Sequence, residues 1–492
     1  MSSTEHPFLD GTVKRLLIDG QWCEARTGRT FESRNPATGD LLATIAEGDA
    51  ADIDRAVAAA RRAFESGPWP RMLPAERQNI LLRLADLLDA RCEDFALLDT
   101  LDMGSPIRHT QGSVGLLAGV LRYNAGMARA LHGETLHPSV PDMFAATVKE
   151  PVGVCGAIIP WNGPLWATVL KVAPVLATGC TLVLKPAEDA SLSPLLFGAL
   201  CLEAGVPPGV INVVPGHGAT AGAALAAHLD VDKMSFTGSE VTGRKIVQAS
   251  AGNLKRLSLE LGGKSPNIVF ADADLDAAVP AAAIAAFANS GQVCSAGTRL
   301  FVERPIAEAF AAEVARFAAN LRIGDGRDPE TDLGPLVSAR QMSRVAGYID
   351  GARAEGARVV SGGCRMSGAP WDAGYFMPPT VLADLCDEMQ VVREEVFGPV
   401  VSVLPFDTAE EAVRRANATP FGLGAGVWTR DLARAHRLGR ALRAGSVWVN
   451  CYNMIDPAVP SGGYKASGYG REYGTLHLEE HLQVKSLWFR TA

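Results

Sequence analysis

The chain has 492 residues, of which 48% are hydrophobic and 20% are charged, and its formal net charge is −8 at pH 7. This composition is typical of a globular enzyme and excludes a disordered chain, and the length predicts about three domains. Because the net charge is negative and Lys and Arg form no cluster, we expect neither nucleic acid nor an anionic membrane as a partner.

The nine cysteines are scattered along the chain. They form no C-x-x-C pair and no Cys/His cluster at zinc spacing, so the sequence predicts no metal site and free thiols in a reducing compartment. Residues 1–15 contain no basic segment followed by an apolar one, so we expect no secretory signal there. No apolar run reaches membrane-spanning length. We therefore expect a cytoplasmic protein.

The first quarter of the chain changes its pattern at about residue 49. Residues 14–47 alternate short apolar runs with turn residues, which predicts edge strands and hairpins. Helices are expected after that point, most clearly at 52–64 and 77–88, because their apolar residues recur at i, i+3 and i+4.

Two series of alternating strands and helices follow, from Pro151 to Glu260 and from about Leu261 to Gly445. Apolar runs predict the strands 153–159, 181–185, 210–214 and 233–236 in the first series, and 267–270, 298–302, 400–404 and 446–450 in the second. Such alternation is typical of parallel α/β sheets with crossover helices. The sequence therefore predicts two α/β sheets with a cleft between them.

Cys294 is a candidate nucleophile. It follows an alanine-rich run, 277–288, that predicts a buried helix broken by Gly291. On the turn that follows, or at the N-terminus of the next short helix, unpaired N–H groups and the helix dipole would favour a thiolate. Most free cysteines are small core residues, but this polar, glycine-flanked turn is a poor place to bury one.

Two further residues suit the same chemistry. Asn162 lies in the stretch 160–164, directly after a predicted strand, where α/β folds bind ligands. With the N–H of Cys294 its amide can hold an oxyanion, although a plain turn asparagine is the alternative. Glu260 lies between two leucines, and apolar surroundings push a carboxylate toward the neutral form and suit a base. The alternative is a strand-end glutamate that faces water.

Two stretches are candidates for nucleotide binding. Lys185 and Glu188 follow one strand, and a carboxylate there suits the hydroxyls of an adenosine ribose, although a solvated Lys–Glu pair is an equal alternative. Residues 235–243 pass from a strand through a glycine turn into a helix, whose N-terminus can hold a pyrophosphate. Because the stretch is neither G-x-G-x-x-G nor a P-loop, its glycines alone do not establish a phosphate site.

Together these stretches resemble the aldehyde dehydrogenase superfamily over nearly the whole chain, from about Leu17 to Leu487. The resemblance rests on the order and spacing of seven runs, which are PWN (160–162), KPAE (185–188), FTGSEVTG (236–243), LELGGKSP (259–266), GQVCSAGTR (291–299), EEVFGPV (394–400) and GGYKASGYGRE (462–472). It implies an NAD-dependent dehydrogenase with two Rossmann-like domains, a cleft between them and a small β oligomerisation element.

The family's mechanism, placed on these positions, makes Cys294 the nucleophile that attacks the aldehyde carbon. Asn162 and the Cys294 N–H hold the oxyanion, hydride passes to the nicotinamide, and Glu260 activates the water that hydrolyses the thioester. Lys171 is the fourth expected catalytic residue. Because family members that transfer the acyl group to coenzyme A generally lack the glutamate found at 260, we expect hydrolysis to the acid. A coenzyme A-acylating dehydrogenase and a Cys–Glu–Lys thiol hydrolase or amidase are the alternatives.

The resemblance also implies which residues contact NAD. Glu188 favours NAD over NADP, because a carboxylate repels a 2′-phosphate. Lys185 shares the adenosine ribose with it, and Glu395 and Phe397 are expected at the nicotinamide. The whole expected set is Ile159, Pro160, Trp161, Asn162, Lys185, Ala187, Glu188, Gly218, Phe236, Thr237, Gly238, Ser239, Thr242, Leu261, Gly262, Glu395 and Phe397.

A substrate tunnel follows from the same resemblance, with the expected lining Gly163, Trp166, Ala167, Leu170, Val293, Ser295, Asn453, Ile455 and Val459. The set is mostly apolar and has no arginine for a substrate carboxylate. Trp166 is its only aromatic face for a quaternary ammonium group. We therefore expect a bulky apolar aldehyde, either aromatic, terpenoid or medium-chain aliphatic, although Asp456 is close to the tunnel in sequence.

Three functional parts are expected, namely an NAD-binding domain at 1–132 and 151–260, a catalytic domain at 261–460, and an oligomerisation element at 133–150 and 475–492. Residues 133–150 predict a protruding hairpin, and the apolar run at 479–489 predicts a strand that stays exposed unless another subunit pairs with it. We therefore expect a homodimer or homotetramer.

Overall fold

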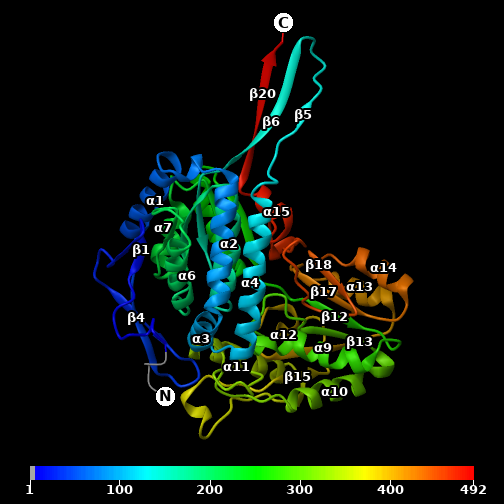
Figure 1. The fold of residues 1–492 in the computed structure, drawn as a ribbon. Coiled ribbons are helices and arrows are strands. Elements are labelled where there is room, and N and C mark those ends of the chain that lie inside the picture. The colour runs from blue at the N-terminus through cyan, green and yellow to red at the C-terminus, as the bar shows by residue number, and fades with distance from the viewer. Residues whose placement is uncertain (1–5, 492) are drawn as a thin grey trace.

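The computed structural model describes residues 6–491. The first five residues of the stretch considered for a secretory signal therefore lie outside it, as does Ala492 of the expected oligomerisation element. Two helix-covered sheets form the body of the molecule, and a narrow three-stranded sheet projects from it (Figure 1). This arrangement confirms the predicted α/β fold of two sheets with an additional β element.

Within residues 6–491 the first sheet has eight strands, in the order β19-β11-β10-β7-β8-β9-β1-β2. The strands β11, β10, β7, β8 and β9 are parallel, whereas β19 at one edge and β1 and β2 at the other pair antiparallel. In spatial order the strands span Gly468–Tyr469, Arg256–Leu261, Lys233–Gly238, Val154–Ile158, Thr181–Lys185, Ile211–Val213, Leu16–Ile18 and Gln21–Cys23. The sequence predicted a parallel sheet, and the structure differs from this prediction only by the antiparallel strands at its two edges.

Helices cover both faces of this sheet, which is why its central strands are almost wholly buried. They are α1 (Ala50–Glu65), α2 (Pro74–Ala90), α3 (Cys92–Met103), α4 (Ile107–Met127), α5 (Pro164–Thr178), α6 (Leu192–Glu203), α7 (Ala223–Ala227), α8 (Glu240–Ala249) and α15 (Gly474–Glu479). The expected helices at 52–64 and 77–88 lie inside α1 and α2. In α1 the side chain of Asp49 accepts the Ala51 N–H and caps the first turn.

The second sheet has the order β14-β15-β16-β13-β12-β17-β18, and all its strand pairs are parallel except β14 with β15. These strands span Arg358–Ser361, Thr380–Ala383, Val400–Phe406, Arg299–Glu303, Pro266–Val269, Gly424–Trp428 and Ser446–Val449. Its helices are α9 (Leu275–Phe287), α10 (Ala307–Ala319), α11 (Ala339–Ala354), α12 (Gln390–Arg393), α13 (Ala409–Asn417) and α14 (Leu432–Ala441). Strands β14, β15 and β17 are additional to those expected, and the glycines of β17 conceal it because glycine weakens a strand pattern.

The chain crosses from the first sheet to the second between β11 and β12, at residues 262–265. It returns near its end, where β19 pairs with β11 and places Gly468 opposite Glu260. Both sheets therefore meet around Glu260.

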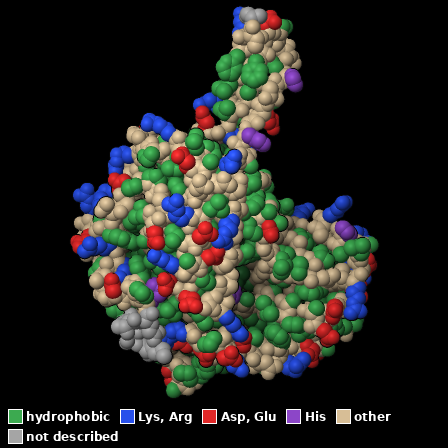
Figure 2. All heavy atoms as spheres, in the orientation of Figure 1, with side chains coloured by type: hydrophobic (Ala, Val, Ile, Leu, Met, Phe, Trp, Pro, Cys, Tyr) green, Lys and Arg blue, Asp and Glu red, His purple; other side chains and the backbone are tan. Residues whose placement is uncertain are grey.

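A projecting arm is formed by β5 (Thr135–Leu136), β6 (Met143–Pro151) and β20 (Leu482–Arg490). Strand β20 pairs with β6 of the same chain along its whole length. Strand β20 is nevertheless exposed along most of its length, and its other edge has no partner among the described residues. That another subunit pairs with it stays a prediction. The side chains of Phe144, Val484, Trp488 and Phe489 are exposed, and Figure 2 shows hydrophobic atoms gathered on this arm.

A separate hairpin, β3 (Thr30–Arg34) with β4 (Leu41–Ala46), forms the turn-rich N-terminal region as expected. Among the described helices, none is both long enough and apolar enough to cross a membrane.

Two buried carboxyl groups on α3 hold the starts of α5 and α6. Asp99 accepts hydrogen bonds from the Ser193 hydroxyl and from the first turn of α5. Asp102 accepts the Leu192 N–H at 3.0 Å and the Ser33 hydroxyl at 2.6 Å. Burial raises the pKa of Asp99 to about 7 and that of Asp102 to about 6. At low pH both are neutral acids, and at high pH both are buried charges.

We expect Asp99→Asn to flatten the pH dependence of stability. Because the folded pKa of Asp99 is raised above its unfolded value, the native state binds the proton more tightly, and this contribution to stability is lost as pH rises toward about 7. From about pH 5 to about pH 8 the variant should gain roughly 2–3 kcal/mol in free energy of unfolding relative to wild type. Urea denaturation at several pH values measures it. Equal pH dependence in both proteins contradicts the assignment, and the surface variant Asp86→Asn is the control.

Candidate active site

One cavity of roughly 250 Å³ lies where the two sheets meet. Asn162 reaches it from the loop between β7 and α5, Glu260 from the end of β11, and Cys294 from the turn before β13. The three residues are far apart in sequence, and the fold brings them to the same cavity. The C-terminal ends of parallel strands are the usual ligand edge of such sheets.

The turn before Cys294 has an unusual backbone. Helix α9 ends at Phe287, close to the expected end of its alanine-rich run, and Asn289, Ser290 and Gly291 then all have positive φ. A side chain at Gly291 would place its Cβ 2.0 Å from the Gly398 carbonyl oxygen, so only glycine fits there.

Several hydrogen bonds hold this strained turn. The Ser290 hydroxyl donates to the Gly334 carbonyl at 2.7 Å, and the Asn289 amide donates to the Asn162 carbonyl at 3.2 Å. The Gln292 side-chain oxygen accepts the Val337 N–H at 2.9 Å. The position of Cys294 is thus fixed from both sides of the cavity.

The Asn162 side chain lies against the segment that carries the cysteine. Its Nδ2 donates to the Gln292 carbonyl oxygen at 2.9 Å, and a primary amide has a second N–H to offer. The backbone N–H of Cys294 has no acceptor among the described residues. Two donors beside the sulfur are therefore free to bind an oxygen atom of a ligand.

The thiol of Cys294 does not match the expected ionised state. Burial raises its pKa to about 12, and the carboxyl groups of Glu395, Glu260 and Glu472 add to this effect. The Ser295 N–H acts in the opposite direction but is outweighed. The prediction of a favoured thiolate is wrong for this state, because the turn leads into β13 rather than into a helix, and carboxyl groups surround the sulfur.

Glu260 lies inside the cavity rather than at a water-facing strand end. Its Oε1 is buried and has no hydrogen-bond partner in the part of the chain that the structure describes. Burial raises its pKa well above the usual value, Glu472 raises it further, and Lys171 acts against both. A neutral carboxyl group beside a thiol is suited to exchange protons.

Lys171 and Glu472 form an ion pair beside Glu260. The Lys171 side chain is only 3% exposed, so its charge depends on the Glu472 carboxylate for compensation. Glu472 also lines the cavity. Sequence reasoning quoted the run that contains Glu472 but assigned the residue no role, since nothing in its spacing indicates that β19 folds back onto β11.

Many of the residues expected to contact the cofactor lie where parallel strands of the first sheet end. Ile159, Pro160 and Trp161 follow β7, Ala187 and Glu188 follow β8, Phe236 to Gly238 end β10, and Leu261 and Gly262 lie at the end of β11. Lys185 is only 2% exposed and contacts Glu188 at 3.2 Å, so the two are not a solvated pair. His217 adds a ring nitrogen 3.7 Å from the same carboxylate.

The start of α8 and the turn at Gly218 complete this edge. Ser239 is the N-cap of α8 and accepts the Thr242 N–H at 3.3 Å, which leaves the N–H groups of Glu240 and Val241 without helical acceptors. A Cβ placed at Gly218 would meet no atom within 4 Å, so the space beside it is open.

Glu395 and Phe397 reach the same region from the second sheet. Glu395 accepts the Gly263 N–H at 3.0 Å, and burial raises its pKa to about 7. The Phe397 ring packs edge-on against Trp161 with centroids 5.3 Å apart. A Cβ at Gly262 would lie 2.3 Å from the Glu395 carboxylate, so a side chain there would displace that carboxylate.

The cavity includes most of the expected tunnel residues and adds a second wall. Those present are Gly163, Trp166, Ala167, Leu170, Val293, Ser295, Asn453 and Ile455. Val459 instead lies on the surface, 60% exposed, because residues 456–459 form a turn in which its N–H donates to the Asp456 carbonyl. Asp456 does not line the cavity either.

The second wall comes from α3 and α4 and was missed by sequence reasoning. It consists of Asp99, Met103, Ser105, His109, Thr110, Ser113 and Leu117. The sequence feature that could have indicated this wall is the spacing of four between His109, Ser113 and Leu117, which places them on one face of a helix. Trp448 and Tyr473 also line the cavity. The lining is still mostly apolar, as expected, but Trp166 is not its only aromatic face.

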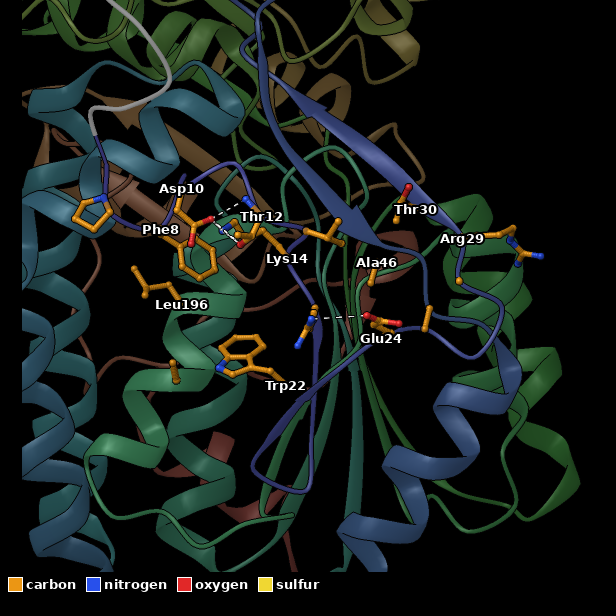
Figure 3. Close-up of a pocket in the computed structure, with 16 residues that line it drawn as sticks. Phe8, Asp10, Thr12, Lys14, Trp22, Glu24, Arg29, Thr30, Ala46 and Leu196 are labelled. Atoms are coloured by element: carbon orange, nitrogen blue, oxygen red, sulfur yellow. Dashed lines mark hydrogen bonds and ion pairs between the residues drawn. The ribbon is translucent and has the colours of Figure 1, made fainter.

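A larger hollow of roughly 840 Å³ lies elsewhere, between the N-terminal segment, the β1–β2 hairpin and α6 (Figure 3). Its charged side chains are paired with one another, as Asp10 with Lys14 and Arg15 with Glu24. No cysteine lines it among the described residues, so it offers no comparable chemistry. Between residues 6 and 491 no group of His, Cys, Asp and Glu is arranged to hold a metal ion.

Comparison with known proteins gives consistent matches over the whole chain. A model described as the aldehyde dehydrogenase family matches residues 22–487. The human mitochondrial aldehyde dehydrogenase is 47% identical over 476 residues, which are 96% of this chain and 91% of that protein. The NAD+ complex of an aldehyde dehydrogenase from Bacillus cereus has a TM-score of 0.96 and 47% identity, covering 99% of this chain and 98% of that one. Betaine aldehyde dehydrogenase from Staphylococcus aureus, in complex with NAD+, has a TM-score of 0.97 and 39% identity, covering 98% and 96%.

We expect Cys294 of the free protein to react slowly with iodoacetamide at neutral pH, because a thiol pKa near 12 leaves little thiolate. The exposed Cys364 and Cys386 should be labelled first. Glu395→Gln removes a carboxylate that raises this pKa and should speed labelling of Cys294 roughly 2- to 10-fold at alkaline pH. Peptide mass spectrometry measures the rates, with Glu394→Gln as the neighbouring control. Labelling of Cys294 as fast as that of Cys364 contradicts the assignment.

Proposed function

The chain belongs to the aldehyde dehydrogenase family, as its motifs predicted, and we propose that it oxidises a bulky, uncharged aldehyde to the carboxylic acid with NAD. The observation that carries this proposal is the convergence of Cys294, Asn162 and Glu260 on one cavity between the two sheets. In this assignment residues 1–132 and 151–260 bind the cofactor, and residues 261–460 supply the nucleophile.

The edge of the first sheet fits NAD. Glu188, held by the buried Lys185, offers a carboxylate to ribose hydroxyls and would repel the 2′-phosphate of NADP. The unsatisfied N–H groups at the start of α8 suit a pyrophosphate. Glu395 lies on the side toward Cys294 and contributes to its pKa, which suits contact with the nicotinamide half. When bound, NAD accepts the hydride that leaves the substrate carbon.

The chain's own residues perform the remaining steps. The Cys294 sulfur forms a bond to the aldehyde carbon, and its proton passes to a base in the cavity. The Asn162 amide and the Cys294 N–H donate to the resulting oxyanion. After oxidation to the thioester, Glu260 takes a proton from water, the water oxygen bonds to the acyl carbon, and the carbon–sulfur bond breaks to release the acid.

The Lys171–Glu472 pair supports the base. The Lys171 ammonium stabilises the charge on Glu260 once that carboxyl group ionises. The Glu472 carboxylate limits this effect. Glu260 therefore holds a proton at rest, and the Lys171 ammonium lowers the cost of releasing it. We assign both residues a positioning role for the base.

The lining of the cavity restricts the substrate. Its carboxyl groups are Asp99, Glu260 and Glu472, of which the first two have raised pKa values. No Lys or Arg lines it among the described residues, so an aldehyde that carries a carboxylate finds no cationic partner there. Trp166, Trp448 and Tyr473 offer aromatic surface to a ring. These faces and carboxyl groups also suit a quaternary ammonium group, which makes a trimethylammonium aldehyde the second candidate.

We further propose that the arm joins copies of this chain into a homodimer or homotetramer. Support comes from Phe144, Val484, Trp488 and Phe489, whose apolar side chains are exposed on it. A cytoplasmic location is also proposed, and the free state of all nine cysteines supports it.

A panel of aldehydes tests the proposed function directly. With NAD the enzyme should give NADH and the free acid from benzaldehyde-like and medium-chain aldehydes, at a kcat/KM at least about 10-fold above that for a carboxylated aldehyde. NADH absorbance and product analysis measure this, and Cys294→Ala should abolish it. Higher kcat/KM on a trimethylammonium aldehyde favours the second candidate. Stimulation by coenzyme A with a thioester product, or turnover that does not need NAD, contradicts the proposal.

Glu260→Gln separates the two halves of the reaction. The variant keeps the shape of the side chain but cannot accept a proton from water, so it should give one rapid burst of NADH and then turn over at least about 100-fold more slowly. Stopped-flow absorbance resolves the burst. Unchanged steady-state turnover removes Glu260 from the hydrolytic step.

A further inference from the structure

We propose that the preferred aldehyde carries an uncharged hydroxyl group remote from its carbonyl carbon, and that His109 on α4 recognises this hydroxyl. The inference rests on the proposed function and names the substrate class of the same cavity. It comes from the wall formed by α3 and α4, which the catalytic steps do not use.

The wall is one continuous face of a helix. His109, Ser113 and Leu117 recur at a spacing of four on α4, so their side chains lie on the same side, and all three line the cavity. Eight residues of helix span about 12 Å. This face is therefore long enough to run beside an aromatic ring with a short substituent, and its polar residues lie at the N-terminal end of α4.

His109 has an imidazole that the protein leaves unused. Its side chain is exposed where it lines the cavity, and its ring makes no hydrogen bond, ion pair or ring contact with any described residue. Enclosure lowers its pKa, so the ring is neutral at physiological pH. A neutral imidazole has one N–H donor and one nitrogen acceptor, which matches a hydroxyl group that both donates and accepts.

Neighbouring hydroxyls add to this polar end. The buried Ser105 Oγ has no hydrogen-bond partner among the described residues, and a buried hydroxyl without a partner is costly unless a ligand or water satisfies it. Ser113 donates to the His109 carbonyl oxygen at 3.0 Å and keeps its acceptor capacity. Thr110 differs, because its hydroxyl is already bonded to Thr100 and Ile107.

The charges in the cavity select an uncharged polar group. A carboxylate or phosphate would meet the Glu472 carboxylate and would find no lining Lys or Arg in the described chain, whereas the raised pKa values of Asp99 and Glu260 favour their neutral forms. Aromatic faces of Trp166 and Trp448 remain for the body of the substrate. The combination points to a hydroxylated aromatic aldehyde.

Matched aldehyde pairs test this inference. Hydroxybenzaldehydes and hydroxycinnamaldehydes are compared with their methyl-substituted analogues, and the ratio of kcat/KM within each pair is measured for wild type and variants. Comparison of variant with wild type cancels the intrinsic reactivity of each aldehyde. In His109→Leu the preference for the hydroxyl member should fall at least about 10-fold while kcat/KM for the methyl member changes little.

Three further variants make the result specific. His109→Gln keeps a donor and an acceptor and should retain part of the preference, and Ser105→Ala should lower it less than His109→Leu. His436→Leu, which alters an exposed histidine on α14, should leave the ratio unchanged. Activity on the methyl member shows that each variant is folded.

The outcomes separate this inference from the function on which it rests. If no aldehyde yields NADH, the proposed function fails. If both members of each pair are oxidised and His109→Leu leaves their ratio unchanged, only the hydroxyl inference fails. A wild-type preference for trimethylammonium aldehydes over both members also overturns it.

Discussion

The hydrogen bond from the Asn162 side chain to the Gln292 carbonyl oxygen joins the two sheets at the cavity where we propose that the chemistry occurs. Asn162 follows β7 in the first sheet, and Gln292 belongs to the turn that precedes β13 in the second. The turn bends sharply, with Gly291 pressed against the Gly398 backbone, so the sulfur of Cys294 has little freedom. This contact holds the thiol, which belongs to the second sheet, against the amide and the carboxyl group, which both belong to the first.

The charges around this junction keep the resting enzyme unreactive. Burial and nearby carboxyl groups raise the pKa of the Cys294 thiol, and burial also raises the pKa of Glu260 and Glu395. In the free protein the proton therefore stays on sulfur, and the nucleophile is protected from adventitious electrophiles and oxidants. A ligand that brings positive charge into the site, or removes a carboxylate from it, would reverse this balance.

Local patterns in the sequence predicted the fold and pointed to the residues that we propose as the reacting groups. The apolar runs 181–185 and 400–404, for example, form strands as expected. The motifs around Asn162, Glu260 and Cys294 indicated the family. The long-range features could not be predicted, because they depend on how distant segments pack. The raised thiol pKa follows from three carboxyl groups on separate elements, and the polar wall of α4 follows from which of its faces meets the cavity. Val459 was expected to line the tunnel, but a tight turn places this apolar residue on the surface.

The pocket around Glu260 depends on strand β19 and on the residues that follow it. This strand lies beside Glu260, and the next few residues supply Glu472 to Lys171 and Glu480 to Lys233. All of them come from the last 25 positions of the chain. A polypeptide whose residues 468–480 have not yet left the ribosome can therefore form the other strands of both sheets, but the pocket around Glu260 closes only after those residues emerge.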